Sequence, residues 1–314
     1  MASWKTMQPA GSIGKVFIIA TGGTIASTQN SSGACVPTLH RAQLVERAGA
    51  HYPTTGIDSA FLDSSDMPLA DIDELVVATR RALADPEIVG VVITHGTDSL
   101  ADTALALDLM HSDPRPVILT GAQRPADHPA PDGPRNLRES IELAADPSAR
   151  NRGVLVRFGG RTLPARGVIK RHTSDLDAFH ATSPLPLSRP APLAPVQLSS
   201  VDVVIVSAWA GASETALRAI ASTRPDGVVV AAMGSGNVST AMGHVLTGML
   251  NDDTPVVIST QLPEGEVTFD YGGAGGGHTL GALGAIPAGY LRPHQARIAL
   301  TAALAAGIDP ASLF

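Results

Sequence analysis

Four side chains that could act on a carbonyl carbon each stand at the end of a short apolar run. Thr24 follows one run after two glycines, Thr97 and Asp98 follow a second, and Lys170 closes a third. A hydroxyl can act as a nucleophile, while a carboxylate and an amine can move protons and hold charge. The pattern therefore indicates a nucleophile, an acid–base pair and a cation, provided that the fold brings the three stretches together.

Strands that alternate with helices would bring them together. Short apolar runs bounded by glycine or proline are typical of buried parallel strands. Right-handed crossovers put the carboxyl ends of parallel strands at one edge of a sheet, where open α/β sheets bind their ligands. In the first part of the chain we expect strands at 15–20, 57–62, 88–94, 116–120, 153–158 and 168–170, and helices at 39–48, 71–83, 99–110 and 136–145.

The alternation stops at a proline-rich stretch and then starts again. Residues 183–200 carry five prolines, so we expect them to be extended and stiff. The sequence thus predicts an α/β protein with a larger N-terminal parallel-sheet domain (1–182), a linker (183–200) and a smaller C-terminal α/β domain (201–314). In that last domain we expect strands at 201–208, 227–232 and 255–260, and helices at 213–222, 239–250 and 293–306.

Charge, hydropathy and cysteine content narrow the class of protein. The net charge of −7 and the pI near 5.8 argue against nucleic-acid binding, which needs a basic face. No apolar run approaches the length of a membrane span, and Met1–Gly14 lacks the apolar centre of an export signal. The single cysteine, Cys35, excludes an internal disulfide and a multi-thiolate metal site. We expect a cytoplasmic protein without a metal or other cofactor.

Two stretches near the reactive residues have local signals of their own. The polar residues 27–37 show no periodicity and predict a mobile loop directly after Thr24, well placed to act as a lid. The apolar spacing within 99–110 predicts an amphipathic helix.

Taken singly, each reactive residue also has a plainer interpretation. Thr24 or Ser27 could cap a helix, and Thr97, Asp98 and the serine after them could form an ordinary helix N-cap. Lys170 could be a solvated surface lysine. These alternatives weaken once the surrounding motifs are considered together.

The motifs resemble those of the asparaginase/glutaminase family of threonine-dependent amidohydrolases. Ala20–Ala26 and Thr94–Ser99 are similar to its two signature motifs, in the same order and at a similar spacing. Asp63–Met67, Gly121–Pro125 and Gly234–Asn237 are similar to further family segments. The resemblance extends from about residue 15 to about residue 306, which is most of the chain.

The resemblance implies a mechanism for hydrolysis of L-asparagine to L-aspartate and ammonia, with room for some glutaminase activity. Thr24 would attack the side-chain amide and form an acyl-enzyme, and ammonia would leave. Thr97 would activate water, Lys170 would act as the base, and Asp98 would hold Lys170 and bind the α-amino group of the substrate. In this family either of the two threonines has been taken as the first nucleophile, and the sequence leaves the choice between Thr24 and Thr97 open.

The resemblance also implies how the amino-acid substrate is held. Ser64 would bind its α-carboxylate, while Ser65 stands where the family usually has glutamine. Asn237 would reach the site from a neighbouring subunit, which implies a homo-oligomer built as a dimer of dimers, with no nucleic acid or membrane as partner. The expected substrate-binding residues are Gly23, Ser64, Ser65, Gly96, Ala122 and Asn237.

Two departures from the family pattern keep alternatives open. Residues 27–38 lack the tyrosine that the family's lid usually carries, and Asp270-Tyr271 with glycines stands where a glutamate is expected. A weak or inactive amino-acid-binding protein of the same fold is one alternative, and an amidohydrolase that prefers glutamine or D-asparagine is another. A nucleotide-binding module is disfavoured because G-x-G-x-x-G and G-K-[ST] are missing, and an amidotransferase subunit because an appended domain is missing.

Overall fold

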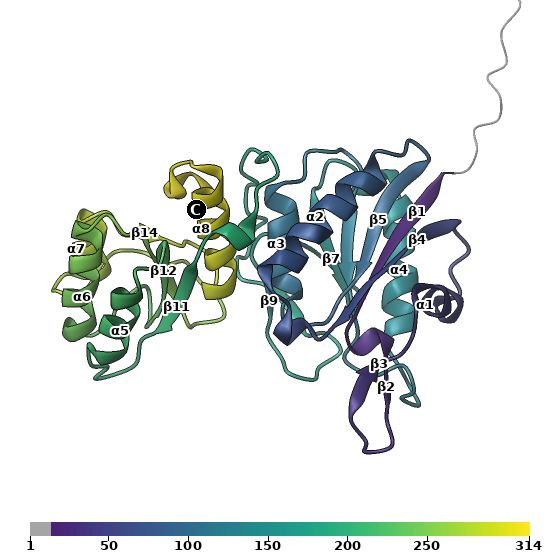
Figure 1. Cartoon of the computed structure of the whole chain (residues 1–314), viewed down its shortest axis with the longest axis horizontal. Coiled ribbons are helices and arrows are strands. Elements are labelled where there is room, and N and C mark those ends of the chain that lie inside the picture. The colour runs from purple at the N-terminus through teal and green to yellow at the C-terminus, as the bar shows by residue number, and fades with distance from the viewer. Residues whose placement is uncertain (1–13) are drawn as a thin grey trace, which may run out of the picture.

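The computed structural model describes residues 14–314, and residues 60–62 by their backbone alone. The chain forms two sheet-containing domains side by side, joined by an extended stretch (Figure 1). The predicted fold class, with a larger N-terminal parallel sheet and a smaller C-terminal α/β domain, is confirmed. The sequence predicts that Met1–Gly14 holds no export signal. Of these residues only Gly14 belongs to the described part of the structure, so this stays a prediction.

The N-terminal sheet has six strands in the order β4-β1-β5-β6-β7-β8, and all neighbours are parallel except β7 and β8. Helices α2 and α3 cover one face, and α1 and α4 cover the other. The strands are β1 Lys15–Gly22, β4 Thr54–Leu62, β5 Ile88–Thr94, β6 Val117–Thr120, β7 Val154–Phe158 and β8 Arg161–Pro164; the helices are α1 Arg41–Ala48, α2 Leu69–Leu83, α3 Leu100–Leu109 and α4 Gly133–Ala145.

The first strand explains why the apolar runs lack alternation. Ile19 packs with α2 and α3, while Ile18 and Ala20 pack with α1 and α4, and none of the three is exposed. Successive side chains of a strand point to opposite faces, so a strand covered on both faces must be apolar throughout. The glycines that follow then carry the chain out at the carboxyl edge.

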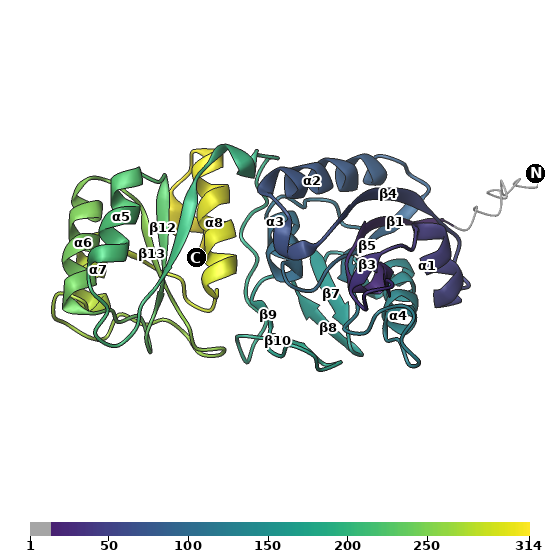
Figure 2. The same ribbon diagram turned by 60° about the horizontal axis from the view of Figure 1, so that its bottom comes forward.

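The C-terminal sheet is parallel throughout, in the order β11-β12-β13-β14. Helices α5, α6 and α7 cover its outer face, and α8 covers the face toward the N-terminal domain (Figures 1 and 2). The strands are β11 Val203–Ser207, β12 Gly227–Ala232, β13 Val256–Thr260 and β14 Ile286–Pro287; the helices are α5 Thr215–Thr223, α6 Thr240–Asn251, α7 Gly277–Ala282 and α8 Pro293–Ala306.

Helix α8 joins the two domains into one core. Figure 2 shows it between the C-terminal sheet and α3, and its side chains share a single apolar cluster with both. Ala296, Ala299, Ala302 and Ala303 are fully buried, and such small side chains let neighbouring elements approach closely. Because α8 faces protein on both sides, a residue of α8 can contact the N-terminal domain directly.

The proline-rich stretch lies along the N-terminal domain. The Leu193 N–H donates to the Leu109 carbonyl at 2.8 Å, and Leu198, which is fully buried, donates its N–H to Asp73 at 2.8 Å. The stretch therefore packs against α2 and α3 rather than hanging free between the domains.

Residues 27–37, for which we predicted a mobile loop, contain regular structure. Strands β2 (Ser27–Gln29) and β3 (Cys35–Pro37) form an antiparallel hairpin, which projects from the domain in Figure 1. The Asn30 side chain accepts hydrogen bonds from the backbone of the turn, and Gly33 supplies its positive φ of 83°. A two-stranded ribbon with mostly exposed residues has no buried face, so it leaves no apolar alternation in the sequence.

The prediction of an amphipathic helix at 99–110 needs a correction as well. Helix α3 is buried around most of its circumference, including the polar residues Thr103 and Asp108. It lies between the N-terminal sheet and α8, so it has little solvent face.

A buried histidine supports the loop that follows β5. His95 is fully buried, and its Nδ1 lies 2.7 Å from the Gly96 carbonyl oxygen. A carbonyl only accepts, so Nδ1 carries the proton, and Nε2 accepts from the Thr103 hydroxyl at 3.0 Å. Burial lowers the pKa of His95 from its ordinary 6.5 to about 4, against the opposing effect of the Gly96 hydrogen bond.

This burial makes stability depend on pH. Between pH 6.5 and about 4, His95 is protonated in the unfolded chain but neutral in the folded protein. Its contribution to the free energy of unfolding is therefore complete above pH 6.5 and decreases as the pH falls toward 4. We expect wild type to lose about 3 kcal/mol more of its unfolding free energy over this range than His95→Asn. Denaturant unfolding at a series of pH values measures this difference, and equal pH slopes in the two proteins would contradict it.

Candidate active site

The Lys170 side chain meets Thr97 and Asp98 across the domain. Its Nζ donates to Thr97 Oγ1 at 2.7 Å and to Asp98 Oδ1 at 2.7 Å, and its side chain is 20% exposed. Lys170 ends β9 (Val168–Lys170), which pairs antiparallel with β10 (Phe179–Ala181). The buried Phe179 ring packs on Phe158 at the end of β7, with ring centroids 4.9 Å apart, so the lysine backbone is anchored to the main sheet.

The loop that carries Thr97 and Asp98 rests on Ser64. Ser64 is buried and its hydroxyl oxygen accepts the Asp98 N–H at 3.2 Å, while its carbonyl accepts from the Ser99 hydroxyl at 2.6 Å. A Cβ on Gly96 would lie 2.4 Å from the Ser64 hydroxyl oxygen. Only glycine at 96 allows this approach.

The turn after β1 touches the same loop. Gly23 has a φ of 72°, and a Cβ there would lie 2.5 Å from the Gly96 nitrogen. Thr24 follows directly and opens a single 3₁₀ turn, Thr24–Ala26, with a partly exposed side chain. Within the described residues its hydroxyl has no hydrogen-bond partner. The fold therefore brings the Thr24 turn against the Thr97 loop and leaves the Thr24 hydroxyl free.

The loop after β6 forms the next part of the site. The Thr97 hydroxyl lies 3.5 Å from Gln123 Oε1, and the Gln123 amide nitrogen donates to the Asp175 carbonyl at 3.1 Å. Ala122, which directly precedes Gln123, is fully buried. Gln123 thereby links Thr97 to the loop that follows Lys170.

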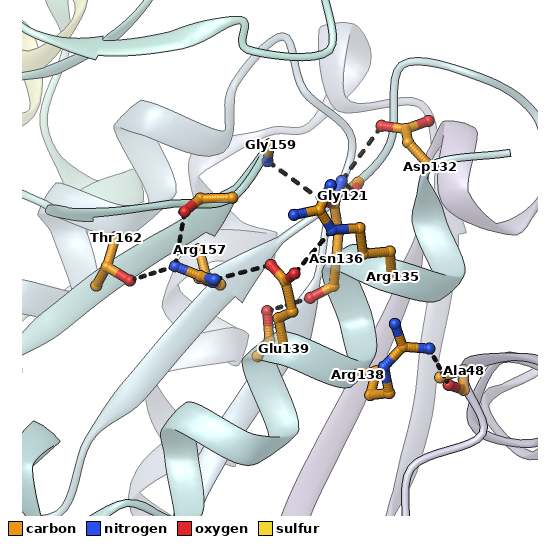
Figure 3. A network of polar contacts seen from close by, with 12 residues as sticks. Ala48, Gly121, Asp132, Arg135, Asn136, Arg138, Glu139, Arg157, Gly159 and Thr162 are labelled. Atoms are coloured by element: carbon orange, nitrogen blue, oxygen red, sulfur yellow. Dashed lines mark hydrogen bonds and ion pairs between the residues drawn. The ribbon is translucent and has the colours of Figure 1, made fainter.

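Helix α4 holds the backbone of this loop in place. As Figure 3 shows, the Asn136 side chain donates to the Gly121 carbonyl at 3.0 Å and accepts the Gly159 N–H at 3.2 Å. Asp132 accepts the backbone N–H of Gln123 at 3.0 Å. The buried Asn136 amide and the partly buried Asp132 carboxylate, each bonded to backbone groups, fix the geometry of this loop.

The remaining predicted residues stand apart from this cluster. Ser65 is exposed, and its backbone N–H donates to Asp63. Asn237 lies in the turn between β12 and α6 of the C-terminal domain, where its backbone pairs with Met233. No described contact joins Asn237 to the Thr97 loop of the same chain.

The plainer interpretations of the reactive residues do not hold. Ser99 is the N-cap of α3 but makes no side-chain capping bond, and Asp98 contacts Lys170 instead. No helix follows Thr24, because the 3₁₀ turn leads into the hairpin. Lys170 is largely buried rather than solvated.

The backbone of the site offers a donor for a developing negative charge. The Gly96–Thr97 peptide bond is trans, so the Thr97 N–H points away from the Gly96 carbonyl that His95 holds. Among residues 14–314 no group accepts this N–H. A free backbone N–H beside a reactive hydroxyl is the arrangement of an oxyanion site.

The described residues contain no group of three histidine, cysteine or carboxylate side chains that could hold a metal ion. None of the helices in residues 14–314 is both long and apolar enough to cross a bilayer. A groove of about 1100 Å³ lies between β4, α2 and residues 195–199, and none of its lining residues belongs to the Lys170 cluster.

Sequence reasoning missed two residues that shape this site. Gln123 lies inside a recognised motif, and its polar side chain at a strand end was a usable signal. His95 also lies inside a motif, but only the structure reveals that both of its ring nitrogens are bonded and fully buried.

Comparison with known proteins finds matches over both domains of the chain. Residues 15–192 match the family described as "Asparaginase, N-terminal", and residues 202–313 match "Glutaminase/Asparaginase C-terminal domain". A probable L-asparaginase of Deinococcus radiodurans is 35% identical, with 94% of each chain covered, and L-asparaginase 2 of Escherichia coli is 30% identical, covering 94% of this chain and 90% of that one.

A solved structure gives the same result. The crystal structure of a probable cytoplasmic L-asparaginase from Campylobacter jejuni superimposes with a TM-score of 0.83 at 29% identity, covering 96% of this chain and 98% of that one. Family matches over both domains, relatives of nearly full length and a shared fold agree, and the chain belongs to the asparaginase family.

Proposed function

We propose that this protein hydrolyses L-asparagine to L-aspartate and ammonia through an acyl-enzyme on Thr24. The observation that carries the proposal is the Lys170 ammonium group, which contacts both Thr97 Oγ1 and Asp98 Oδ1 at 2.7 Å. The names of the relatives support the substrate, because they are called L-asparaginases. Glutamine is a slower substrate in this proposal.

Thr24 Oγ attacks the side-chain amide carbon, since its hydroxyl lies free beside the Thr97 loop. The carbon–nitrogen bond breaks, the leaving group takes up a proton and departs as ammonia, and an ester to Thr24 remains. Water then attacks the ester and restores the Thr24 hydroxyl as aspartate leaves. The Thr97 N–H stabilises the oxyanion in both steps.

Thr97 and Lys170 act together as the proton relay. Lys170 Nζ holds the Thr97 hydroxyl in one orientation, so that this hydroxyl can position the attacking water. In each step the ammonium group gives a proton through Thr97 to the departing nitrogen or oxygen, and the neutral amine that remains takes up the proton lost by the attacking Thr24 hydroxyl or water. Asp98 balances the charge of Lys170 through Oδ1, which leaves Oδ2 for the α-amino group of the substrate.

Ser64 orients the other end of the substrate. Its hydroxyl oxygen already accepts the Asp98 N–H, so its own proton is free to be donated to an α-carboxylate. Asp98 and Ser64 together suit an α-amino acid, with a positive and a negative group on one carbon.

We further propose that the site is completed by a second subunit in a dimer of dimers. The Asp98 side chain is 59% exposed, so the site of one chain lies open to water that a hydrolase of this kind has to control. Asn237 of a neighbouring chain covers it in this proposal. For the compartment we propose the cytoplasm, on the name of the Campylobacter jejuni neighbour, although a Haemophilus influenzae relative is named periplasmic.

Ammonia release from L-asparagine, L-glutamine and D-asparagine tests the function. We expect L-asparagine to give the highest kcat/KM, and Lys170→Met to lower kcat about 10²- to 10⁴-fold because the proton relay is lost. Lys15→Met is the matched control, since Lys15 also pairs with a carboxylate, Glu87, at 2.9 Å but far from the site. Ligand binding without turnover in wild type would instead favour an amino-acid-binding protein.

Mixed oligomers test the shared site. Thr24→Ala and Asn237→Ala are each expected to be nearly inactive, because each damages every site of its own homo-oligomer. Random exchange of subunits between them should restore about a quarter of wild-type activity, since half of the dimers then hold one intact site. Size-exclusion chromatography with light scattering gives the assembly, and a mixture no more active than its parents would reject the shared site.

A further inference from the structure

We propose that Gln295, a residue of the C-terminal domain, is a positioning residue that sets the distance between Lys170 and Thr97. This inference rests on the proposed function and adds a residue to it. The side chain is 2% exposed and lies in the first turn of α8, where that helix faces the N-terminal domain. It is polar in a helix that is otherwise largely apolar.

The amide of Gln295 satisfies three backbone groups at once. Its Nε2 donates to the Ala101 carbonyl at 2.9 Å and to the Ala165 carbonyl at 2.8 Å, and its Oε1 accepts the Gly167 N–H at 2.8 Å. Both N–H groups of the amide are therefore used, and its oxygen accepts one hydrogen bond.

The backbone groups that it joins belong to the two halves of the proposed relay. Ala101 lies in the first turn of α3, three residues after Asp98, and Gly167 lies three residues before Lys170. More than sixty residues of chain separate Ala101 from Ala165 and Gly167, so the distance between these stretches is set by such contacts. One planar amide between them defines that separation.

The turn before Lys170 can transmit the position that Gln295 sets. Gly167 has a φ of 80°, and a Cβ there would lie 2.8 Å from the Leu187 side chain. Its carbonyl accepts the Thr182 N–H at 2.8 Å while its N–H reaches Gln295. Since both sides of this residue are held, a shift at Gln295 moves the start of β9.

A second contact crosses the domains at the same turn and serves as a control. The Arg166 side chain, which is 8% exposed, donates to the Leu313 carbonyl at 2.8 Å. It ties the turn to the C-terminal end of the chain, and among residues 14–314 it makes no hydrogen bond to α3, although the charge of Asp108 on α3 lies close enough to act on it. Arg166 and Gln295 both join the two domains, but only Gln295 bridges Ala101 and Gly167.

The test compares Gln295→Met, Gln295→Glu and Arg166→Met in the full chain. Methionine keeps the length of glutamine without its hydrogen bonds, so we expect kcat to fall about 10- to 100-fold with KM within about threefold of wild type, because the relay is misplaced. Glutamate keeps an acceptor for the Gly167 N–H, so its kcat should lie between those of wild type and Gln295→Met. Arg166→Met should stay within about threefold of wild type.

Hydrogen exchange measured by mass spectrometry gives a readout that does not need activity. In Gln295→Met, or in Gln295→Glu if the former fails to fold, we expect faster exchange in peptides covering 97–103 and 165–171. If Arg166→Met loses kcat equally, or if exchange is unchanged in either peptide, the inference is wrong. If wild type releases no ammonia from any amide, the proposed function fails, and hydrogen exchange alone then decides whether Gln295 bridges the two segments.

Discussion

The ammonium group of Lys170 sets the requirements that the rest of the site must meet. It contacts a hydroxyl and a carboxylate at 2.7 Å each, although these groups lie more than seventy residues away along the chain. Charge-assisted hydrogen bonds of this length are strongest where water competes little; the lysine side chain is 20% exposed, whereas the Asp98 side chain is 59% exposed in the single chain. Small errors in backbone position would therefore break them, so the segments on either side must be held rigidly.

Close backbone contacts and buried polar anchors meet that requirement. Gly23 and Gly96 let two turns touch, and a side chain at either position would overlap its neighbour. Ser64, Asn136 and Gln295 each bind loop backbone through a buried side chain. The parallel strands β1 and β5 bring the Thr24 turn and the Thr97 loop to one edge. Lys170 comes instead from β9, which the sequence analysis expected beside the parallel strands but which pairs antiparallel with β10 in a separate sheet. The anchors fix the final separation of these residues. The C-terminal domain, through α8, takes part in this as well as in the shared core.

Local sequence patterns indicate the candidate site residues better than the residues that support them. Apolar runs with glycine turns are local signals, and they place Thr24, Thr97 and Lys170 at strand ends without tertiary information. The hairpin at 27–37 and the burial of α3 were mispredicted, because both depend on which surfaces the rest of the chain covers. Gln295 has no local signal, since a glutamine in a helix is ordinary until its three backbone partners are known.

Mass spectrometry of an acid-quenched turnover mixture tests the division of labour between the two threonines most directly. Wild-type protein mixed with L-asparagine, quenched within one turnover and digested, should carry an aspartyl ester on Thr24, and the ester should accumulate in a Thr97→Val variant because deacylation is slowed. An ester on Thr97 instead, or rapid turnover with no ester on either residue, would contradict the account.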